Sequence, residues 1–289
     1  MPTSLAGGVT HSLLGKNFWN IGIWESLLLG IFVLIGIFIL IFLCYGVKEF
    51  GKYIHNIYVD SIWGNAIIEL KNAYSEIHFL RKKDEINDEE FIQVMIIFCD
   101  TIKRIFDKKT KTNCCVSIKV AILNGDNVSF ENTINSIELK NLCRDSRHGD
   151  RDTKKYQSIK HGLFANTAYN IIANKIVKEN QRHLAYVNND ILNSKDYMNT
   201  SKECYTDGKL PYNSELVYPI IPIKTDKSTK NDLKILKGFI CIDSESSNAF
   251  DEERYDIPMI EGVADGIYDI FEKYDSSINR NSQKYGNIT

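Results

Sequence analysis

The chain has 289 residues, of which 44% are hydrophobic and 25% are charged, enough for one domain of about 150 to 200 residues plus additional elements. Its 35 lysines and arginines against 37 aspartates and glutamates give a formal net charge of −2. This balance argues against an extended basic surface for a nucleic acid polymer. The seven cysteines lack regular spacing, which indicates reduced thiols in a cytosolic compartment.

A run of twenty uncharged residues, Ser26 to Tyr45, contains fifteen Leu, Ile, Phe or Val residues. As a helix it would span about 30 Å, the thickness of the bilayer hydrocarbon, and those fifteen side chains favour insertion by roughly 5 to 9 kcal/mol. A buried core helix of this kind needs a larger protein around it, and the run is too long for a cleaved signal peptide. We predict an extracytoplasmic segment at 1–25 and a transmembrane helix at 26–46.

The residues that flank the run predict its orientation. Lys16 precedes it, whereas Lys48 and Lys52 follow it, and the positive-inside rule places the lysine-rich side in the cytoplasm. Trp24 and Tyr45 lie near the two ends, where aromatic side chains favour the membrane interfaces. The abundance of Asn, Ile and Lys is typical of an AT-rich bacterial genome. We therefore expect a single-pass protein of the bacterial inner membrane with a cytoplasmic C-terminal domain.

Two connector helices are predicted at 47–110. From Val47 to Leu80, nine steps between apolar residues cover 33 positions, a mean step of about 3.67 that matches an amphipathic helix. Asn87, with Glu90 three residues later, is the N-cap signal of a second helix. Both helices could pack on the soluble core. For the first, the seam of a dimer or larger oligomer is an equal alternative, since a helix that leaves the membrane has no core of its own.

The region 111–274 reads as one α+β domain with an antiparallel sheet and helices packed on it, followed by a polar tail at 275–289. A hairpin-type turn is expected at 124–126, and a long polar loop at 188–213. Strands are expected at 114–123, 134–142, 184–187, 215–223 and 234–244, and helices at 163–177 and 252–274.

The C-terminal third of this region resembles the GAF family of sensory domains. The resemblance rests on the strand YPIIPI, the strand Gly238–Asp243, the turn Ala249–Asp251, and a final helix with Ile260 and Ala264. It implies a sheet of about six antiparallel strands with helices on one side and a ligand pocket on the other. Family members commonly bind nucleotides or tetrapyrroles and often dimerise through their terminal helices.

The chain departs from the family in two places. The region 188–213 is longer and more polar than is typical. Asn248, Phe250, Asp251 and Glu252 lie close together, but the lysine of the Asn-Lys-Phe-Asp-Glu set of the cyclic-nucleotide variant is missing. We therefore interpret these four residues as a chance likeness, and the resemblance does not identify a ligand or a cofactor.

Catalytic and metal-binding motifs are scarce. The sequence lacks a Walker-type phosphate loop, a nucleophile elbow and the zinc-protease helix motif. Cys114 and Cys115 open a strand and should face opposite sides, which favours packing. A zinc site could combine Cys143, His148 and His161, but no ligand spacing supports it.

Residues 144–152 alternate arginine and aspartate around a glycine. Guanidinium groups beside a sheet edge can bind a phosphate through two parallel hydrogen bonds, although a solvated loop paired with itself is the simpler interpretation. The candidate ligand-binding residues are Arg144, Arg147, His148 and Arg151.

These observations predict a membrane-anchored cytoplasmic sensor, and not an enzyme, that binds a small molecule and signals through its membrane helix. Its partners would be the lipid bilayer, further copies of the chain and an unidentified ligand. With only a polar tail after Tyr274, the output would be the membrane helix or a separate protein. One alternative is an anti-phage defence effector that oligomerises and disrupts the membrane. A second is an unrecognised enzyme, for which titratable groups should converge in the pocket.

Overall fold

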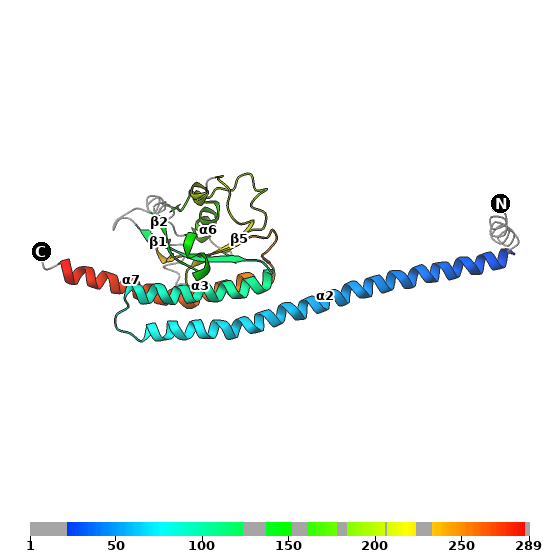
Figure 1. Cartoon of the computed structure of the whole chain (residues 1–289), viewed down its shortest axis with the longest axis horizontal. Helices are drawn as coiled ribbons and strands as arrows, with labels where there is room; N and C mark the ends of the chain where they lie inside the picture. Colours follow the sequence, from blue (N-terminus) through cyan, green and yellow to red (C-terminus); the bar gives the residue numbers. More distant parts are fainter. Residues whose placement is uncertain are drawn as a thin grey trace, which may run out of the picture. The chain divides into compact units, whose positions relative to one another are not determined.

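The computed structural model describes residues 22–123, 137–151, 161–177, 184–205, 207–223 and 233–286. The chain divides into two compact units, 1–60 and 61–289, whose elements are labelled in Figure 1. The turn predicted at 124–126 lies outside the described residues.

Helix α2 runs from Ile23 to Arg81, so the predicted span and the first connector helix belong to one element. In the first unit its apolar side chains face outward, and Phe32, Phe38 and Phe42 are between 70% and 76% exposed. Among the described residues, this is the one helix that is long and apolar enough to cross a membrane. Core helices of soluble proteins can pass the same length test, but none of the apolar window of α2 is buried.

The second unit contains a six-stranded antiparallel sheet with the strand order β3-β2-β1-β6-β5-β4. The predicted α+β fold class is confirmed. Strand β6 pairs with β1 on one side and β5 on the other, which explains why its sequence GFICID is largely apolar on both faces. The strands are β1 (Cys114–Leu123), β2 (Ile137–Arg144), β3 (His161–Gly162), β4 (Tyr186–Asn188), β5 (Ser214–Ile220) and β6 (Gly238–Ser244).

Helices cover both faces of this sheet, as Figure 1 shows: α3 and α7 lie on one face and α6 on the other. The resemblance implied helices on one side of the sheet only, and the structure differs from this because α6 packs on the other side. The helices are α3 (Asp88–Thr110), α6 (Thr167–Val177) and α7 (Asp256–Gly286), and the short 3-10 helices are η1 (Ser146–Arg151), η2 (Thr200–Cys204) and η3 (Leu233–Ile235). The strand predicted from 234 therefore begins only at Gly238.

Helix α3 begins where its sequence predicts. The Asn87 side chain accepts a hydrogen bond from the Glu90 backbone N–H at 2.8 Å, which satisfies one of the free donors of the first turn. The helix ends at Thr110, and its C-cap is Lys111, whose φ of 56° lies in the left-handed region. Acidic residues in the first turn and Lys108 and Lys109 in the last turn complement the helix dipole.

The last third of α2 belongs to the core of the second unit. Ile77 and Leu80 are buried, the Trp63 ring contacts Phe106 edge-on at 6.1 Å, and Tyr74 contacts Phe98 at 5.1 Å between centroids. From the sequence alone, the first connector helix is expected to have no core to pack on. From residue 61 onward this expectation is wrong, because the helix packs in the core of the second unit.

Helix α7 holds the C-terminal end of α2 by polar contacts. The Tyr74 hydroxyl donates to the Gly262 carbonyl at 3.0 Å, and the Arg81 guanidinium donates to the Gly266 carbonyl at 2.7 Å. The Lys273 ammonium donates to the Arg81 carbonyl at 2.6 Å, where the last turn of a helix leaves carbonyls free. A Cβ at Gly266 would lie 2.5 Å from the Tyr74 hydroxyl oxygen, so the absence of a side chain there lets the two helices meet.

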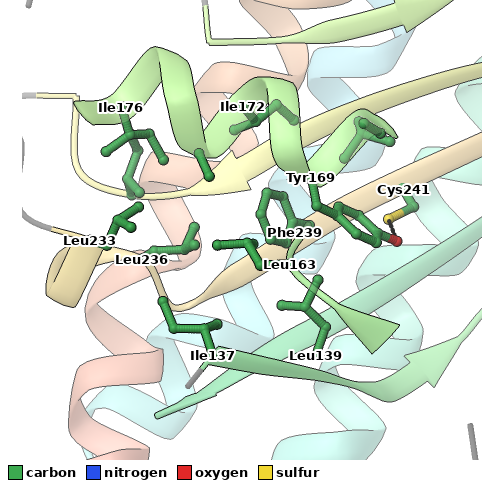
Figure 2. Close-up of a cluster of buried hydrophobic side chains, with 14 residues drawn as sticks. Ile137, Leu139, Leu163, Tyr169, Ile172, Ile176, Leu233, Leu236, Phe239 and Cys241 are labelled. Atoms are coloured by element: carbon green, nitrogen blue, oxygen red, sulfur yellow. Dashed lines mark hydrogen bonds between the residues drawn. The ribbon is translucent and has the colours of Figure 1, made fainter. Parts of the chain in front are cut away.

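The sheet face under α6 carries a second hydrophobic cluster. Figure 2 shows Tyr169 of α6 beside Phe239 of β6 and Ile176 of the same helix on the side of Leu233, with Leu139 of β2 in the same cluster. Burying such side chains stabilises the fold by about 1.5 to 3 kcal/mol each. Two members of this cluster, Tyr169 and Cys241, also line a pocket on the same face.

Candidate functional site

A pocket lies on the α6 side of the sheet, beside the hydrophobic cluster. The space between its walls, with the open mouth included, is about 410 Å³. Its walls combine charged, hydroxyl and aromatic side chains from the sheet, from α6 and from the segments after β2 and β4. They are Ser117, Lys119, Arg144, Arg151, Tyr169, Asn199, Ser201, Tyr205, Tyr212, Glu215, Cys241 and Asp243.

Strand register explains why these sheet residues meet. Asp243 of β6 lies opposite Glu215 of β5, and one pleat further along Cys241 lies opposite Ser117 of β1. Cross-strand partners point to the same face, and alternate residues along a strand share that face. Lys119, two residues after Ser117, therefore joins the same polar surface.

Arg144 reaches this surface because β2 contains a bulge. Ile118 pairs with Cys143, but Lys119 pairs with Asn141, so Leu142 is an extra residue. An extra residue reverses the alternation of side chains beyond it. Arg144 consequently lies opposite Ser117 on the pocket face, while the Cys143 sulfur lies 3.8 Å from the Cys99 sulfur of α3 on the other face.

The structure separates the four candidate residues predicted from sequence. Arg144 and Arg151 line the pocket, whereas Arg147 is exposed and His148 is buried outside the lining. The interpretation of 144–152 as a solvated loop is wrong for its first half, because Arg144, Asp145 and His148 are each at most 8% exposed. Ligand binding by any of the four remains a prediction.

The buried part of η1 is held by its own hydrogen bonds. His148 Nδ1 lies 2.8 Å from an Asp145 carboxylate oxygen, the other Asp145 oxygen accepts from the Val116 N–H at 2.9 Å, and His148 Nε2 lies 3.2 Å from the Asn113 amide nitrogen. Cys115, whose sulfur accepts from Arg144 at 3.0 Å, completes a group with metal-ligand chemistry. Because these atoms already have partners and a guanidinium lies against the sulfur, we interpret the group as a structural network.

The zinc site considered from sequence is not formed by the described side chains. Cys143 faces α3, whereas His148 contacts Asp145 and Asn113. The His161 backbone lies in β3, paired with Leu139.

The long polar region after β4 covers the pocket. We call residues 189–213, described except for 206, the covering segment; it contains η2 and contributes Asn199, Ser201, Tyr205 and Tyr212 to the walls. Its middle is fixed to the start of α6, where the buried Asn166 side chain accepts from the Thr200 N–H at 2.9 Å. The region that is long and polar in the sequence therefore supplies part of the pocket wall.

Two carboxyl groups dominate the electrostatics of the site. Burial, together with the neighbouring Asp243 carboxylate, raises the pKa of Glu215 to about 8. Burial raises the pKa of Asp243 to about 6, against the opposing effect of Arg144, Arg151 and Lys119. Two nearby acids with separated pKa values are a common feature of binding and catalytic sites.

Glu215 is incompletely hydrogen-bonded. It is 3% exposed, and its Oε1 atom has no partner among the described residues. The Tyr197 hydroxyl donates to the carboxylate, and Asn199 in turn donates to the hydroxyls of Tyr197 and Tyr212 at 2.9 Å each. A buried polar atom without a partner costs about 1 to 3 kcal/mol, so Oε1 is the place where a donor from a ligand would be most favourable.

Sequence reasoning did not single out Glu215 or Asp243. Both stand in strands that are otherwise apolar, in NSELVYP and ICIDS, and a charge inside such a strand was the available signal. Their meeting depends on β5 and β6 being neighbours.

No family model and no curated protein matches this chain. Among solved structures, the type II free methionine-R-sulfoxide reductase of Thermoplasma acidophilum has a TM-score of 0.40 and 17% identity, covering 65% of this chain and 97% of its own. The fRMsr of Staphylococcus aureus in complex with substrate has a TM-score of 0.40 and 15% identity, covering 73% and 95%. A GAF domain from a Coxiella burnetii phosphoenolpyruvate-protein phosphotransferase has a TM-score of 0.37 and 10% identity, covering 77% and 99%. These are likenesses to solved structures at low identity and low TM-score, and nothing further about this chain is concluded from them.

Proposed function

We propose that this protein is a single-pass membrane sensor whose cytoplasmic domain binds a small polar molecule in the covered pocket. The observation that carries the proposal is the pocket itself, with the buried Glu215 carboxylate in its wall and one carboxylate oxygen unpartnered. Polar groups that converge on a covered cavity are typical of ligand sites.

The anchoring part of the proposal rests on residues 26–45. Their side chains are exposed along the whole segment, and such a surface is unfavourable in water by about 25 cal/mol for each Å² of apolar area. In a bilayer this cost disappears. The flanking Lys48 and Lys52 and seven cysteines without a disulfide support a cytoplasmic location for the second unit at the inner membrane.

The signalling part rests on β5, which touches both the pocket and a helix. Glu215 faces the pocket, whereas Tyr218 faces the other side and donates to Glu261 of α7 at 2.8 Å. Helix α7 then contacts α2 through Tyr74 and Arg81. We propose that a ligand bound beside Glu215 shifts β5 and α7 and thereby the end of α2.

The binding step is tested by mass spectrometry of small molecules released from the purified full-length protein in detergent micelles. We expect one small polar molecule to be enriched in the wild type and lost in Glu215→Gln. As a control, Glu245→Gln changes an exposed carboxyl outside the pocket and should keep the molecule. Equal recovery from all three proteins, or recovery from none, would contradict a sensor of this kind.

The signalling step has a natural reporter in Trp63. Its ring is 9% exposed and lies against Phe106 and Tyr255. In a variant with Trp19 and Trp24 changed to phenylalanine, the recovered molecule should shift the Trp63 emission. An unchanged spectrum at saturation would rule out transmission to this part of α2.

An oligomer is favoured by the outer side of α2. Ile57, Ile68 and Phe79 are each separated by eleven residues, or three helical turns, and are 47%, 63% and 61% exposed. A second copy of α2 would cover this stripe with the same residues. Such assembly is also what the defence effector would require, because one helix cannot line a pore. Dye leakage from cells that express the protein, compared with cells that express Ile68→Glu, tests this version, and intact membranes with an assembled wild type would exclude it.

An enzyme is the second candidate, and the observation in its favour is the pair Glu215 and Asp243 with separated pKa values. Cys241 is the one cysteine among the described pocket residues, and burial raises its pKa to about 12, which disfavours a thiolate nucleophile. Prolonged incubation of the recovered molecule with the protein should leave its mass unchanged if the domain is a sensor. Conversion to a product that fails in Asp243→Asn would establish an enzyme.

A further inference from the structure

The charged groups of the pocket are sorted across the sheet. The guanidinium groups of Arg144 and Arg151 come from β2 and the segment that follows it, at one side. Asp243 stands on the central strand β6, and Glu215 on β5 at the other side. One end of the pocket is therefore cationic and the other end acidic.

Asp243 and Glu215 differ in what surrounds them. Asp243 has Arg144, Arg151 and Lys119 as electrostatic partners. Among the cationic side chains of the pocket, Lys119 is the one that lowers the pKa of Glu215. The other titratable groups around Glu215 are the carboxyl of Asp243, the thiol of Cys241 and the phenols of three tyrosines: Tyr186, Tyr197 and Tyr212.

The unpartnered Oε1 of Glu215 indicates which group of a ligand would bind at the acidic end of the pocket. The residue is 3% exposed and lines the cavity, so bulk water does not satisfy it as it would a surface carboxylate. An ionised donor from a ligand would form a charge-assisted hydrogen bond there, roughly twice as strong as a neutral one. At the opposite end, two guanidinium groups suit a carboxylate or phosphate.

We propose that the pocket binds a small zwitterion, with an ammonium group against Glu215 and a carboxylate or phosphate group against Arg144 and Arg151. This inference rests on the proposed function and specifies its ligand. The space between the two ends is about 410 Å³ with the open mouth included, which limits the ligand to a small molecule. A purely anionic ligand would leave Oε1 of Glu215 without a donor, and a purely cationic ligand would place like charges against the arginine end.

The first experiment measures calorimetric binding to the full-length protein in detergent micelles. The probes are the twenty amino acids, ornithine, γ-aminobutyrate, taurine and phosphoethanolamine, with the matched amine and matched acid of every probe that binds. We expect at least one zwitterion to bind, and its amine and its acid each to bind at least about 10-fold more weakly, the equivalent of one lost charge contact. Failure of the whole panel, or equal affinity for zwitterion and matched acid, overturns the inference.

Variants then assign each end of the pocket. In Glu215→Gln, the preference for the zwitterion over its matched acid should fall to within about 3-fold, while its preference over the amine remains. In Arg144→Gln, the preference for the zwitterion over its matched amine should be lost, while its preference over the acid remains. Glu245→Gln should bind as the wild type does. Melting temperatures of all variants establish that they are folded, and equal losses of both preferences in either pocket variant would contradict the assigned orientation.

The pH dependence separates an ammonium from a ligand that accepts a hydrogen bond from protonated Glu215. Because burial holds the pKa of that carboxyl at about 8, an ammonium must displace its proton at neutral pH. The affinity should then rise about 10-fold from pH 6.5 to pH 7.5, with close to one proton released into the buffer. An affinity that falls over this range would overturn the inference. If mass spectrometry recovers a molecule without an ammonium group, the sensor proposal stands and the zwitterion is wrong; if it recovers nothing, the sensor proposal itself fails.

Discussion

At the scale of single residues, the domain depends on two glycines through the space that they leave. A Cβ at Gly238 would lie 1.9 Å from the Lys119 carbonyl oxygen, a backbone atom that cannot move without separating β6 from β1. This gives a physical reason for the glycine that opens β6. At Gly266 the obstructing atoms belong to the Tyr74 ring, which is itself confined by Phe98.

Gly266→Ala should therefore destabilise the domain by about 1 to 3 kcal/mol, as other overpacked contacts do. Gly262→Ala is the matched control, because it lies on the same helix and a Cβ there meets nothing within 4 Å. The control should be neutral or stabilising by up to about 1 kcal/mol, since alanine favours the helix. Thermal unfolding of the two variants measures the difference, and equal melting temperatures would show that Tyr74 does not pack on α7 as described.

Glu215 should make stability depend on pH. Its pKa is raised in the folded state to about 8 from 4.5, so the folded protein retains a proton that the unfolded chain has lost, and stability falls as the pH rises through this window. Between pH 6 and pH 8 the loss from Glu215 should be about 2 kcal/mol, and Asp243, which is half ionised at pH 6 because its pKa is about 6, adds a smaller loss at the acidic end of this range. Denaturant titrations of wild type and Glu215→Gln should diverge over this range. Parallel curves would mean that the carboxyl ionises normally.

At the scale of elements, the end of α2 is part of the soluble domain. Ile77 is fully buried, so Ile77→Ala should cost about 2 to 5 kcal/mol. Ile223→Ala removes the same atoms from a side chain that is 55% exposed and should cost under about 1 kcal/mol. For the same reason, a fragment that begins at residue 83 should be less stable than one that begins at 61. Equal unfolding of the two point variants would place α2 outside the core.

Local patterns predicted the elements, because helix periodicity, the Asn87 cap and the apolar strand β6 are properties of adjacent residues. The site was harder to predict because its parts are joined by register. Asp243 meets Glu215 through strand pairing, and Arg144 joins them through a bulge that no composition signal marks. The sequence identified Arg144 and Arg151 by their charge, but offered no means to separate them from Arg147, which is exposed.

At the scale of the whole molecule, membrane insertion can be tested by placing first one and then two arginines in the apolar segment. With fifteen strongly apolar residues contributing roughly 5 to 9 kcal/mol, one central arginine at a cost of about 3 kcal/mol leaves insertion favourable, whereas two bring it near zero. Phe38→Arg should therefore stay in the membrane fraction after carbonate extraction, and the double variant Ile35→Arg with Phe38→Arg should be largely lost from it. Retention of the double variant would argue against a lipid-spanning segment.

Assembly is tested at the same scale. The exposed stripe on α2 predicts that Ile68→Glu shifts the full-length protein in detergent toward a smaller mass by light scattering, because a buried carboxylate in the seam is unfavourable. Asn72→Glu adds the same charge at an exposed position that is already polar and should change the mass less. A wild type that is monomeric at all concentrations would exclude the oligomer.

The bulge in β2 also has a consequence for how the gene can change. Deletion of the single codon for Leu142 would restore regular pairing and leave the directions of Cys143 and Arg144 unchanged, because Cys143 would still lie opposite Ile118 and Arg144 opposite Ser117. At any regular point of a strand, the same deletion would turn every following side chain to the other face. In a lineage of such proteins, this point of β2 could therefore lose one codon and keep its guanidinium in the pocket.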